Sequence, residues 1–277
     1  MDEFEKLMQS YAGQRVCVIN ITGGNAGDKL ILMGLRKMLD RLGVDYTIRD
    51  LDFRIFTLRV DALFPGLFDF DGYDLVLMRG GGHFNDVWPT GMRILNKVIN
   101  KSKETVVAPH SFWLRRSCIW DTLRPKNRVT IFTRERYSYE YLRGTQLPKD
   151  VCIGLAPDSA FYLTQDDFNL PGCDERVGTL LCFREDTETV MSTKRLKMLY
   201  DLHPSTVFVD LGKKPYEQYV STVARSCIIH TDRLHVGILG AKLGSYVYLY
   251  PNAYWKNRGV YEYSMSDLIN VTFVDGD

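Results

Sequence analysis

Short apolar runs alternate with amphipathic stretches along most of the chain, and this alternation restricts the fold more than any other feature of the sequence. The run at 15–21 has the continuous apolar character of a buried strand, and residues 28–43 show the spacing of a helix that ends at a glycine. The run at 73–82 reads as a further strand that stops in three glycines. Strands that alternate with helices in this way predict a parallel sheet covered by helices on both faces.

A polar stretch that contains proline and glycine interrupts this alternation at 164–176, and the same rhythm restarts after it. Such a composition is typical of a linker. We therefore predict an α/β protein with two Rossmann-like, doubly wound domains, the first over 1–165 and the second over 175–277.

The charge balance and the length of the apolar runs argue against some classes of protein. The 277 residues include 35 Lys and Arg against 34 Asp and Glu, a formal charge of +1, which gives no support to nucleic-acid binding. No apolar run approaches the roughly 20 residues that cross a bilayer. The acidic N-terminal stretch does not resemble a signal peptide, and the six cysteines form no CxxC pair. We expect a cytoplasmic protein with reduced thiols and no integral membrane segment.

Polar residues and glycines gather where the predicted strands end. In doubly wound folds, ligands bind beyond the carboxyl ends of the strands, so these residues are the candidates for a site. They include Asn25, Asp28, Gly81, Gly82, Asn85, Asp86, His110, Arg134, Arg233 and His235.

The chemistry of this set points to a small ligand with a high density of negative charge. Glycine turns before helices offer free backbone N–H groups, arginines recognise carboxylates and phosphates in a bidentate manner, and a histidine titrates near neutral pH. Each residue also has a plain structural explanation. Asp28 lies where a first-turn acid favours the helix dipole, and His235 begins an apolar run typical of a core.

Several motifs that would indicate other chemistry are absent. GGNAGD after the first strand lacks the glycine spacing of GxGxxG, and the chain contains neither GxxxxGK[ST] nor HExxH. No His, Cys, Asp or Glu spacing favours a metal site, so we predict none.

Six segments, taken in order, resemble the polysaccharide pyruvyl transferase family over about residues 17–265. They are GGNAGDKLILMGLRKML, DLVLMRGGGHFND, FTRERYSYEYL, APDSAF, TDRLHVGILGAKLG and YPNAYWKNRGVYEYS. The resemblance implies a fold of the GT-B type, in which the two domains face each other across a cleft. It also implies that phosphoenolpyruvate is the donor and that a pyruvate ketal forms on a sugar of a cell-surface polysaccharide or its precursor.

The resemblance also implies roles for single residues. Arg233 and His235 of the RLH triplet match a donor-binding arginine and a general acid, and Arg134 matches a second donor-binding arginine. Gly81 and Gly82 are expected to bind the donor as well. The family's usual aspartate after the central arginine is replaced here by a glutamate.

On this interpretation the first domain holds the acceptor and part of the donor site, and the second holds the donor site with the RLH triplet. The candidate acceptor ligands are Asn25, Asp28, Asn85, Asp86, His110 and Lys256. His110 stands where relatives often have glutamine, which leaves the local acceptor contacts open.

Two alternatives remain open from the sequence. One is a glycosyltransferase of the same fold that uses a nucleotide-sugar, with Glu262 as the candidate ribose ligand, and the other is a catalytically idle binding relative. No cofactor is expected beyond phosphoenolpyruvate as co-substrate. The acceptor sugar can be lipid-linked or nucleotide-linked, and a lipid-linked acceptor would place the protein peripherally at the inner face of the membrane. The oligomeric state stays open.

Overall fold

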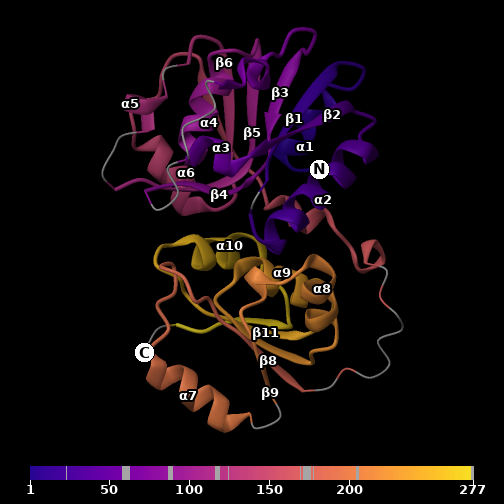
Figure 1. The fold of residues 1–277 in the computed structure, drawn as a ribbon, viewed down its shortest axis with the longest axis vertical. Helices are drawn as coiled ribbons and strands as arrows, with labels where there is room; N and C mark the ends of the chain where they lie inside the picture. Colours follow the sequence, from indigo (N-terminus) through magenta and orange to yellow (C-terminus); the bar gives the residue numbers. More distant parts are fainter. Residues whose placement is uncertain are drawn as a thin grey trace. The chain divides into compact units, whose positions relative to one another are not determined.

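The computed structural model describes residues 1–22, 24–57, 63–86, 90–115, 119–123, 125–168, 170, 176, 178–203 and 206–275. The chain forms two compact units, each built on its own sheet (Figure 1). The first unit comprises Met1–Gly24 and Ile31–Tyr162, and the second comprises Asn25–Leu30 and Leu163–Asp277. The start of one N-terminal helix therefore groups with the second unit, which the sequence pattern does not reveal.

The first unit alternates strands and helices along the chain. Its elements are α1 (Glu3–Gln9), β1 (Arg15–Thr22), α2 (Ala26–Arg41), β2 (Asp45–Asp52), α3 (Phe53–Thr57), η2 (Pro65–Phe68), β3 (Leu75–Met78), β4 (Gly81–Asn85), α4 (Thr90–Ile99), β5 (Glu104–Trp113), α5 (Ile119–Thr122), β6 (Arg128–Thr133), α6 (Arg136–Arg143), β7 (Val151–Leu155) and η3 (Ser159–Tyr162).

The sheet of the first unit has the strand order β2-β1-β3-β5-β6-β7, with β4 paired to β5 beside this path. Every strand pair is parallel. The central strands β1 and β3 are almost wholly buried, whereas β2 at the edge has mostly exposed and half-buried positions, with Leu51 buried. The strand order reverses between β1 and β3, which makes this the switch point of the sheet.

Helices cover both faces of this sheet. On one face, Cys17 and Ile19 of β1 share a core with residues of α3, α4 and α6. On the other face, Val16 and Val18 share a core with residues of α1 and α2. Because successive side chains of a strand point to opposite faces, this division confirms the predicted doubly wound arrangement.

The glycine run after β3 differs from the expectation. The strand stops at Met78, and Gly81 and Gly82 begin a further strand, β4, that pairs with β5. Two features explain why glycines stand here. A Cβ on Gly80 would lie 2.5 Å from the carbonyl oxygen of Pro109, and Gly81 adopts φ +146°, which other residues rarely do.

The second unit repeats the same scheme with a smaller sheet. Its elements are η4 (Gln165–Asp167), β8 (Thr179–Cys182), α7 (Thr193–Leu202), β9 (Thr206–Phe208), η5 (Leu211–Lys213), α8 (Tyr216–Ala224), β10 (Ile228–Thr231), α9 (Leu234–Lys242), β11 (Tyr246–Leu249), α10 (Lys256–Ser264) and β12 (Val271–Phe273).

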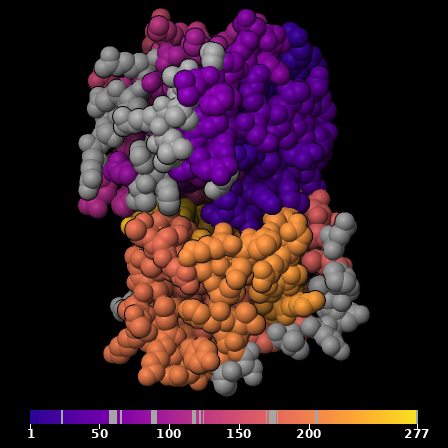
Figure 2. Space-filling view, in the orientation of Figure 1, coloured from indigo at the N-terminus to yellow at the C-terminus, as the bar shows by residue number. Residues whose placement is uncertain are grey.

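The second sheet has the order β12-β11-β10-β8-β9, again with every pair parallel and with the switch point between β8 and β10. Helix α9 packs closely on one face, where a Cβ on Gly240 would lie 2.6 Å from Ile229. Leu199 of α7 packs against Leu181 of β8, and Figure 1 shows α7 on the opposite side of the sheet from α9. Helix α8 lies at the surface of this unit in Figure 2.

The α/β class and the two doubly wound units are therefore confirmed. In the part of the chain that the structure describes, none of the helices combines the length and the apolar character that a membrane span requires. The expected cleft between the domains stays a prediction.

Candidate active site

The switch point of the second sheet holds the RLH triplet. The hydroxyl of Thr231, the last residue of β10, donates a hydrogen bond to the carbonyl oxygen of Cys182 at the end of β8 (2.6 Å). The backbone N–H of Arg233 donates to the same hydroxyl oxygen (3.0 Å), and Arg233 is the N-cap of α9. The two central strands thus fix the start of the triplet where a doubly wound fold binds its ligand.

A buried carboxylate holds the guanidinium of Arg233. Nη2 donates to Oδ2 of Asp210 at 2.6 Å, and Nε donates to Oδ1 of the same side chain. A Cβ on Gly212 would lie 2.4 Å from the guanidinium carbon, so only glycine leaves room for this stacking. Burial raises the pKa of Asp210, but the hydrogen bonds from Arg233 outweigh it and hold the pKa below its ordinary value.

Arg233 belongs to a network of charges that extends to α10. Arg184, just after β8, donates to both carboxylate oxygens of Asp186 at 2.8 and 2.9 Å. It also lies 3.4 Å from Glu188, which accepts a hydrogen bond from Lys256 (2.5 Å). The predicted acceptor ligand Lys256 is therefore a buried member of this network, 6% exposed.

Asp232, inside the TDRLH segment, is a further buried carboxylate of this network. It accepts hydrogen bonds from the backbone N–H of Arg184 (2.8 Å) and from the hydroxyl of Thr189 (2.9 Å). Burial raises the pKa of Asp232 above its ordinary value. The network thus joins three cations to four carboxylates. Its members are Arg184, Arg233, Lys256, Asp186, Glu188, Asp210 and Asp232.

His235 is half-buried at the second position of α9. Its ring lies against the start of α2, since a Cβ on Gly27 would stand 2.6 Å from Nδ1 of His235. A side chain at Gly27 of the GNAGD turn would therefore collide with the histidine of the RLH triplet. The structure brings together two motifs that lie far apart in the sequence.

Asn25 and Asp28 cap α2. Oδ1 of Asn25 accepts from the backbone N–H of Gly27 (2.8 Å), and Oδ2 of Asp28 accepts from the backbone N–H of Asn25 (3.0 Å). This reciprocal pattern resembles a capping box, but the Asn25 side chain accepts from the second rather than the third helical N–H. Their proposed contacts with an acceptor stay predictions.

Arg134 in the first unit is fully buried after β6. Nη1 donates to Asp158 (2.7 Å) and Nε donates to the hydroxyl of Ser111 (2.8 Å), so the ends of three neighbouring strands are joined. Glu135, where the family usually has aspartate, caps α6 by accepting from the backbone N–H of Ser138 (2.8 Å). Burial raises the pKa of Glu135.

His110 lies at the end of β5 with its ring stacked on Phe84, 4.0 Å between centroids. Its Nε2 accepts from the backbone N–H of His83 (3.0 Å), which leaves the ring proton on Nδ1. Burial, followed by the charges of His83 and of Arg134 and Arg79, lowers the pKa of His110 well below its ordinary value. His110 is therefore neutral near neutral pH.

Asn85 and Asp86, at the end of β4, bond to backbone groups. Nδ2 of Asn85 donates to the carbonyl oxygen of Gly82 (2.7 Å), and Oδ2 of Asp86 accepts from the backbone N–H of Arg115 (2.7 Å). Both contacts shape the end of β4. Together with His110 and Arg134, these residues occupy the carboxyl ends of β4, β5 and β6.

Sequence reasoning missed three members of the network in the second unit, Asp186, Glu188 and Asp210. Asp210 follows the apolar run of β9 at its carboxyl end, a position that could have marked it. Glu188 lies in the loop between β8 and α7, and no pattern distinguishes it. Glu262, the candidate ribose ligand of the alternative enzyme, is an exposed residue of α10 whose carboxylate lies 3.7 Å from Arg258.

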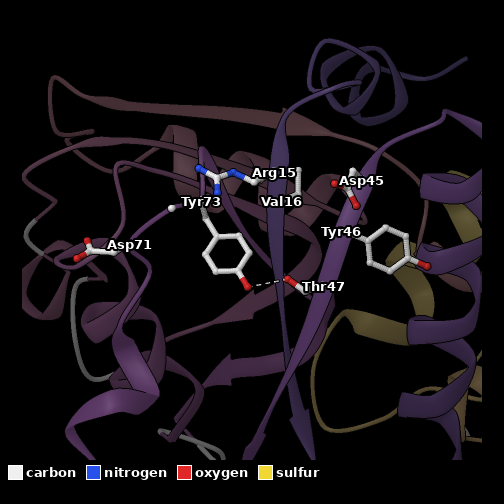
Figure 3. A pocket seen from close by; sticks show the side chains of 8 residues that line it. Arg15, Val16, Asp45, Tyr46, Thr47, Asp71 and Tyr73 are labelled. Carbon is white, nitrogen blue, oxygen red and sulfur yellow. Dashed lines mark hydrogen bonds between the residues drawn. The ribbon is translucent and has the colours of Figure 1, made fainter.

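A depression of about 260 Å³ opens at the opposite edge of the first sheet, at the amino ends of β1 and β2 (Figure 3). Arg15, Asp45, Asp71 and the hydrogen-bonded pair Thr47 and Tyr73 line it. No predicted site residue contributes to this depression. Across the described ranges, no group of three or more His, Cys, Asp or Glu side chains is arranged to hold a metal ion.

Two doubly wound sheets with charged groups at their carboxyl edges define an α/β protein of the kind that binds ligands at strand ends. The chain belongs to the polysaccharide pyruvyl transferase family, whose model matches residues 25–250. It is similar to Pyruvyl transferase 1 of Schizosaccharomyces pombe, at 25% identity over 252 residues, which cover 79% of this chain. The chain spans 61% of the length of that relative.

The fold is also similar to that of a solved protein. The crystal structure of the uncharacterized protein KP1_0663 from Klebsiella pneumoniae subsp. pneumoniae NTUH-K2044 superposes with a TM-score of 0.73 at 22% sequence identity. The match covers 99% of this chain and 98% of that chain, and it supports the fold alone.

Proposed function

We propose that the protein transfers a pyruvyl group from phosphoenolpyruvate to a sugar of a polysaccharide or its precursor and forms a pyruvate ketal. The observation that carries the proposal is the placement of Arg233 and His235 at the start of α9, at the switch point of the second sheet. An arginine suited to an anion and a group suited to proton transfer stand next to each other in a chain of this family.

Arg233 would bind an anionic group of the donor. Asp210 accepts hydrogen bonds from Nε and Nη2 of Arg233, and these bonds fix the direction of the remaining N–H donors of the guanidinium. A guanidinium group that is already held in the binding orientation loses less conformational entropy on binding than a mobile one. Arg134 in the first unit is proposed as a second donor ligand, fixed in the same way by Asp158 and Ser111.

His235 would act as the general acid. Since Nδ1 faces Gly27, we assign the proton transfer to Nε2. The proton goes to the methylene carbon of phosphoenolpyruvate, and the neighbouring carbon gains cationic character. A sugar hydroxyl adds to that carbon and loses its proton. The bond to phosphate then breaks, and a second hydroxyl adds and closes the ketal. One hydroxyl proton replaces the proton that His235 donated, and the other leaves with phosphate.

The acceptor side of the proposal rests on Asn25, Asp28, Asn85, Asp86, His110 and Lys256, with Gly81 and Gly82 on the donor side. The observed contacts of Asn25, Asp28 and Asn85 are local, whereas Asp86, His110 and Lys256 bond to residues remote in the sequence. A cytoplasmic location and a lipid-linked or nucleotide-linked sugar remain part of the proposal.

Incubation with phosphoenolpyruvate and a panel of lipid-linked and nucleotide-linked sugars tests the proposal. We expect release of phosphate together with a mass gain of one pyruvate, less water, on one sugar. His235→Gln protein serves as the control for background hydrolysis. Absence of release, together with tight binding of a nucleoside diphosphate, would replace the proposal by a nucleotide-sugar glycosyltransferase.

A further inference from the structure

Two arginines at the switch point of the second unit share one carboxylate. Arg184 donates to both oxygens of Asp186 at 2.8 and 2.9 Å, and Nη2 of Arg233 lies 3.7 Å from Oδ2 of the same group. A planar carboxylate bound in this bidentate manner has the geometry with which arginine holds an anionic ligand. Asp186 therefore marks a position where an anion is bound by the protein's own cations.

Asp186 differs from the other carboxylates of the network in its exposure. Its side chain is 33% exposed, whereas those of Asp210 and Glu188 are 3% and 4% exposed. It lies in the loop between β8 and α7, outside the strands and helices. Of these three groups, Asp186 can exchange its arginine contacts for water most readily.

The other contacts of Asp186 are local and do not need a negative charge. Its Oδ1 accepts from the backbone N–H of Glu188 (3.0 Å), and its carbonyl oxygen accepts from the N–H of Thr189 (3.1 Å). An asparagine side chain can make the first contact with its amide oxygen. The turn and the arginine contacts are thus separable by mutation.

We propose that Arg184 is an additional anion-binding residue of the donor site and that Asp186 occupies its position until the donor displaces it. The proposal rests on the proposed function, which makes phosphoenolpyruvate the donor. When the donor binds, its carboxylate or phosphoryl group takes the place of the Asp186 carboxylate between Arg184 and Arg233. Asp186 then lowers the donor affinity because it competes for Arg184, and Arg184 raises the donor affinity because it attracts the anion.

The decisive variant is Asp186→Asn, which keeps the turn and removes the competing charge. We expect the dissociation constants of phosphoenolpyruvate and inorganic phosphate, measured by calorimetry, to fall about tenfold, the order expected when a like charge next to an anion is removed. We expect Arg184→Gln to weaken both by about tenfold or more. In the double variant the gain from Asp186→Asn should shrink, because the competition for Arg184 no longer exists and only that for Arg233 remains. Binding of pyruvate in place of phosphate shows which anionic group takes the position.

Two matched controls separate competition from general electrostatics. Asp52, in the first unit, accepts hydrogen bonds at both carboxylate oxygens from Arg54, an arginine two residues away, as Asp186 does from Arg184. Glu185 is the neighbour of Arg184 in the chain and pairs with Lys213 (2.8 Å). Asp52→Asn and Glu185→Gln should each change the dissociation constants less than twofold. A gain in Glu185→Gln as large as that in Asp186→Asn would overturn the proposal.

The two proposals fail in different ways. One outcome is that wild-type protein turns over phosphoenolpyruvate, while Asp186→Asn leaves the donor affinity unchanged or weaker and the KM unchanged or higher. Asp186 is then only structural, and the proposed function stands. If Asp186→Asn tightens phosphate binding and no acceptor gains pyruvate, the anion position stands and the proposed reaction is wrong. Unchanged melting temperatures of the variants show that the comparison concerns folded protein.

Discussion

Nδ1 of His235 lies 2.6 Å from the point where a Cβ would stand on Gly27. The start of α2 and the start of α9 are therefore in contact, and the residue at 27 decides how the histidine ring is oriented.

Gly27→Ala should displace the His235 ring, because a methyl group cannot occupy a point so close to Nδ1. We expect turnover of phosphoenolpyruvate to fall by about 10 to 100-fold, since a shift of about 1 Å at a reacting group can cost that much. Steady-state kinetics measure the loss. Gly66→Ala is the matched control, because a Cβ on Gly66 meets nothing within 4 Å. Equal turnover in the two variants would show that the contact has no role in catalysis.

His235→Gln should separate catalysis from binding. Positioned acid catalysis contributes about 100 to 10,000-fold, so we expect kcat to fall by that factor. The dissociation constant of phosphoenolpyruvate should change little, because the arginines carry the binding. Turnover and calorimetric binding are measured on the same preparation. A folded variant that retains its turnover rules out His235 as the acid.

Asp158→Ala should destabilise the first unit strongly. Arg134 and Asp158 form a fully buried pair, and removing one partner leaves an uncompensated charge, at a cost of about 3–5 kcal/mol in the free energy of unfolding. Urea denaturation measures the change. Glu140→Ala removes an exposed carboxylate 3.8 Å from Arg143 and should cost less than about 1 kcal/mol. Similar losses in the two variants contradict the interpretation.

The stability of the second unit should depend on pH through His230. Burial, and then the neighbouring His203, lower the pKa of His230 from 6.5 to about 4. The unfolded chain then binds the proton more tightly than the folded one, so this stabilisation is present above pH 6.5 and is lost as the pH falls toward 4.

Denaturation between pH 4 and 7 measures this dependence, and the expected slope is up to about 1.4 kcal/mol per pH unit for one proton. His230→Gln should lose that part of the slope. The pKa of His110, which belongs to the first unit, is lowered in the same direction, so the unfolding of that unit should show a pH dependence of its own. A variant whose slope equals that of the wild type shows that His230 does not carry the effect.

Much of the fold could be predicted because its signals are local. The apolar run of β1, the helix that ends near Gly43 and the restart of the rhythm after 164–176 all depend on neighbouring residues. Parallel strands place their carboxyl ends at one edge, so the candidate residues could be selected before any contact was known. The end of β3 at Met78 and the start of β4 at Gly81 could not be predicted from the sequence, because the close approach of Pro109 to Gly80 is a tertiary contact.

The pairing of charges was decided by the tertiary structure. Arg233 was predicted from its motif, but the choice of Asp210 as its partner depends on how β9 and β10 lie beside β8. Asp186 lies in a loop, and the sequence does not show that it contacts both Arg184 and Arg233.

The sequence by itself thus determined the α/β class, the two doubly wound units and the edge of each sheet that carries polar residues, because periodicity and strand direction are properties of short segments. Only the tertiary structure decided which side chains meet. The fit of His235 against Gly27 and the sharing of Asp186 by Arg184 and Arg233 depend on distances between segments remote in the chain. Those distances follow from packing, which sequence spacing does not specify.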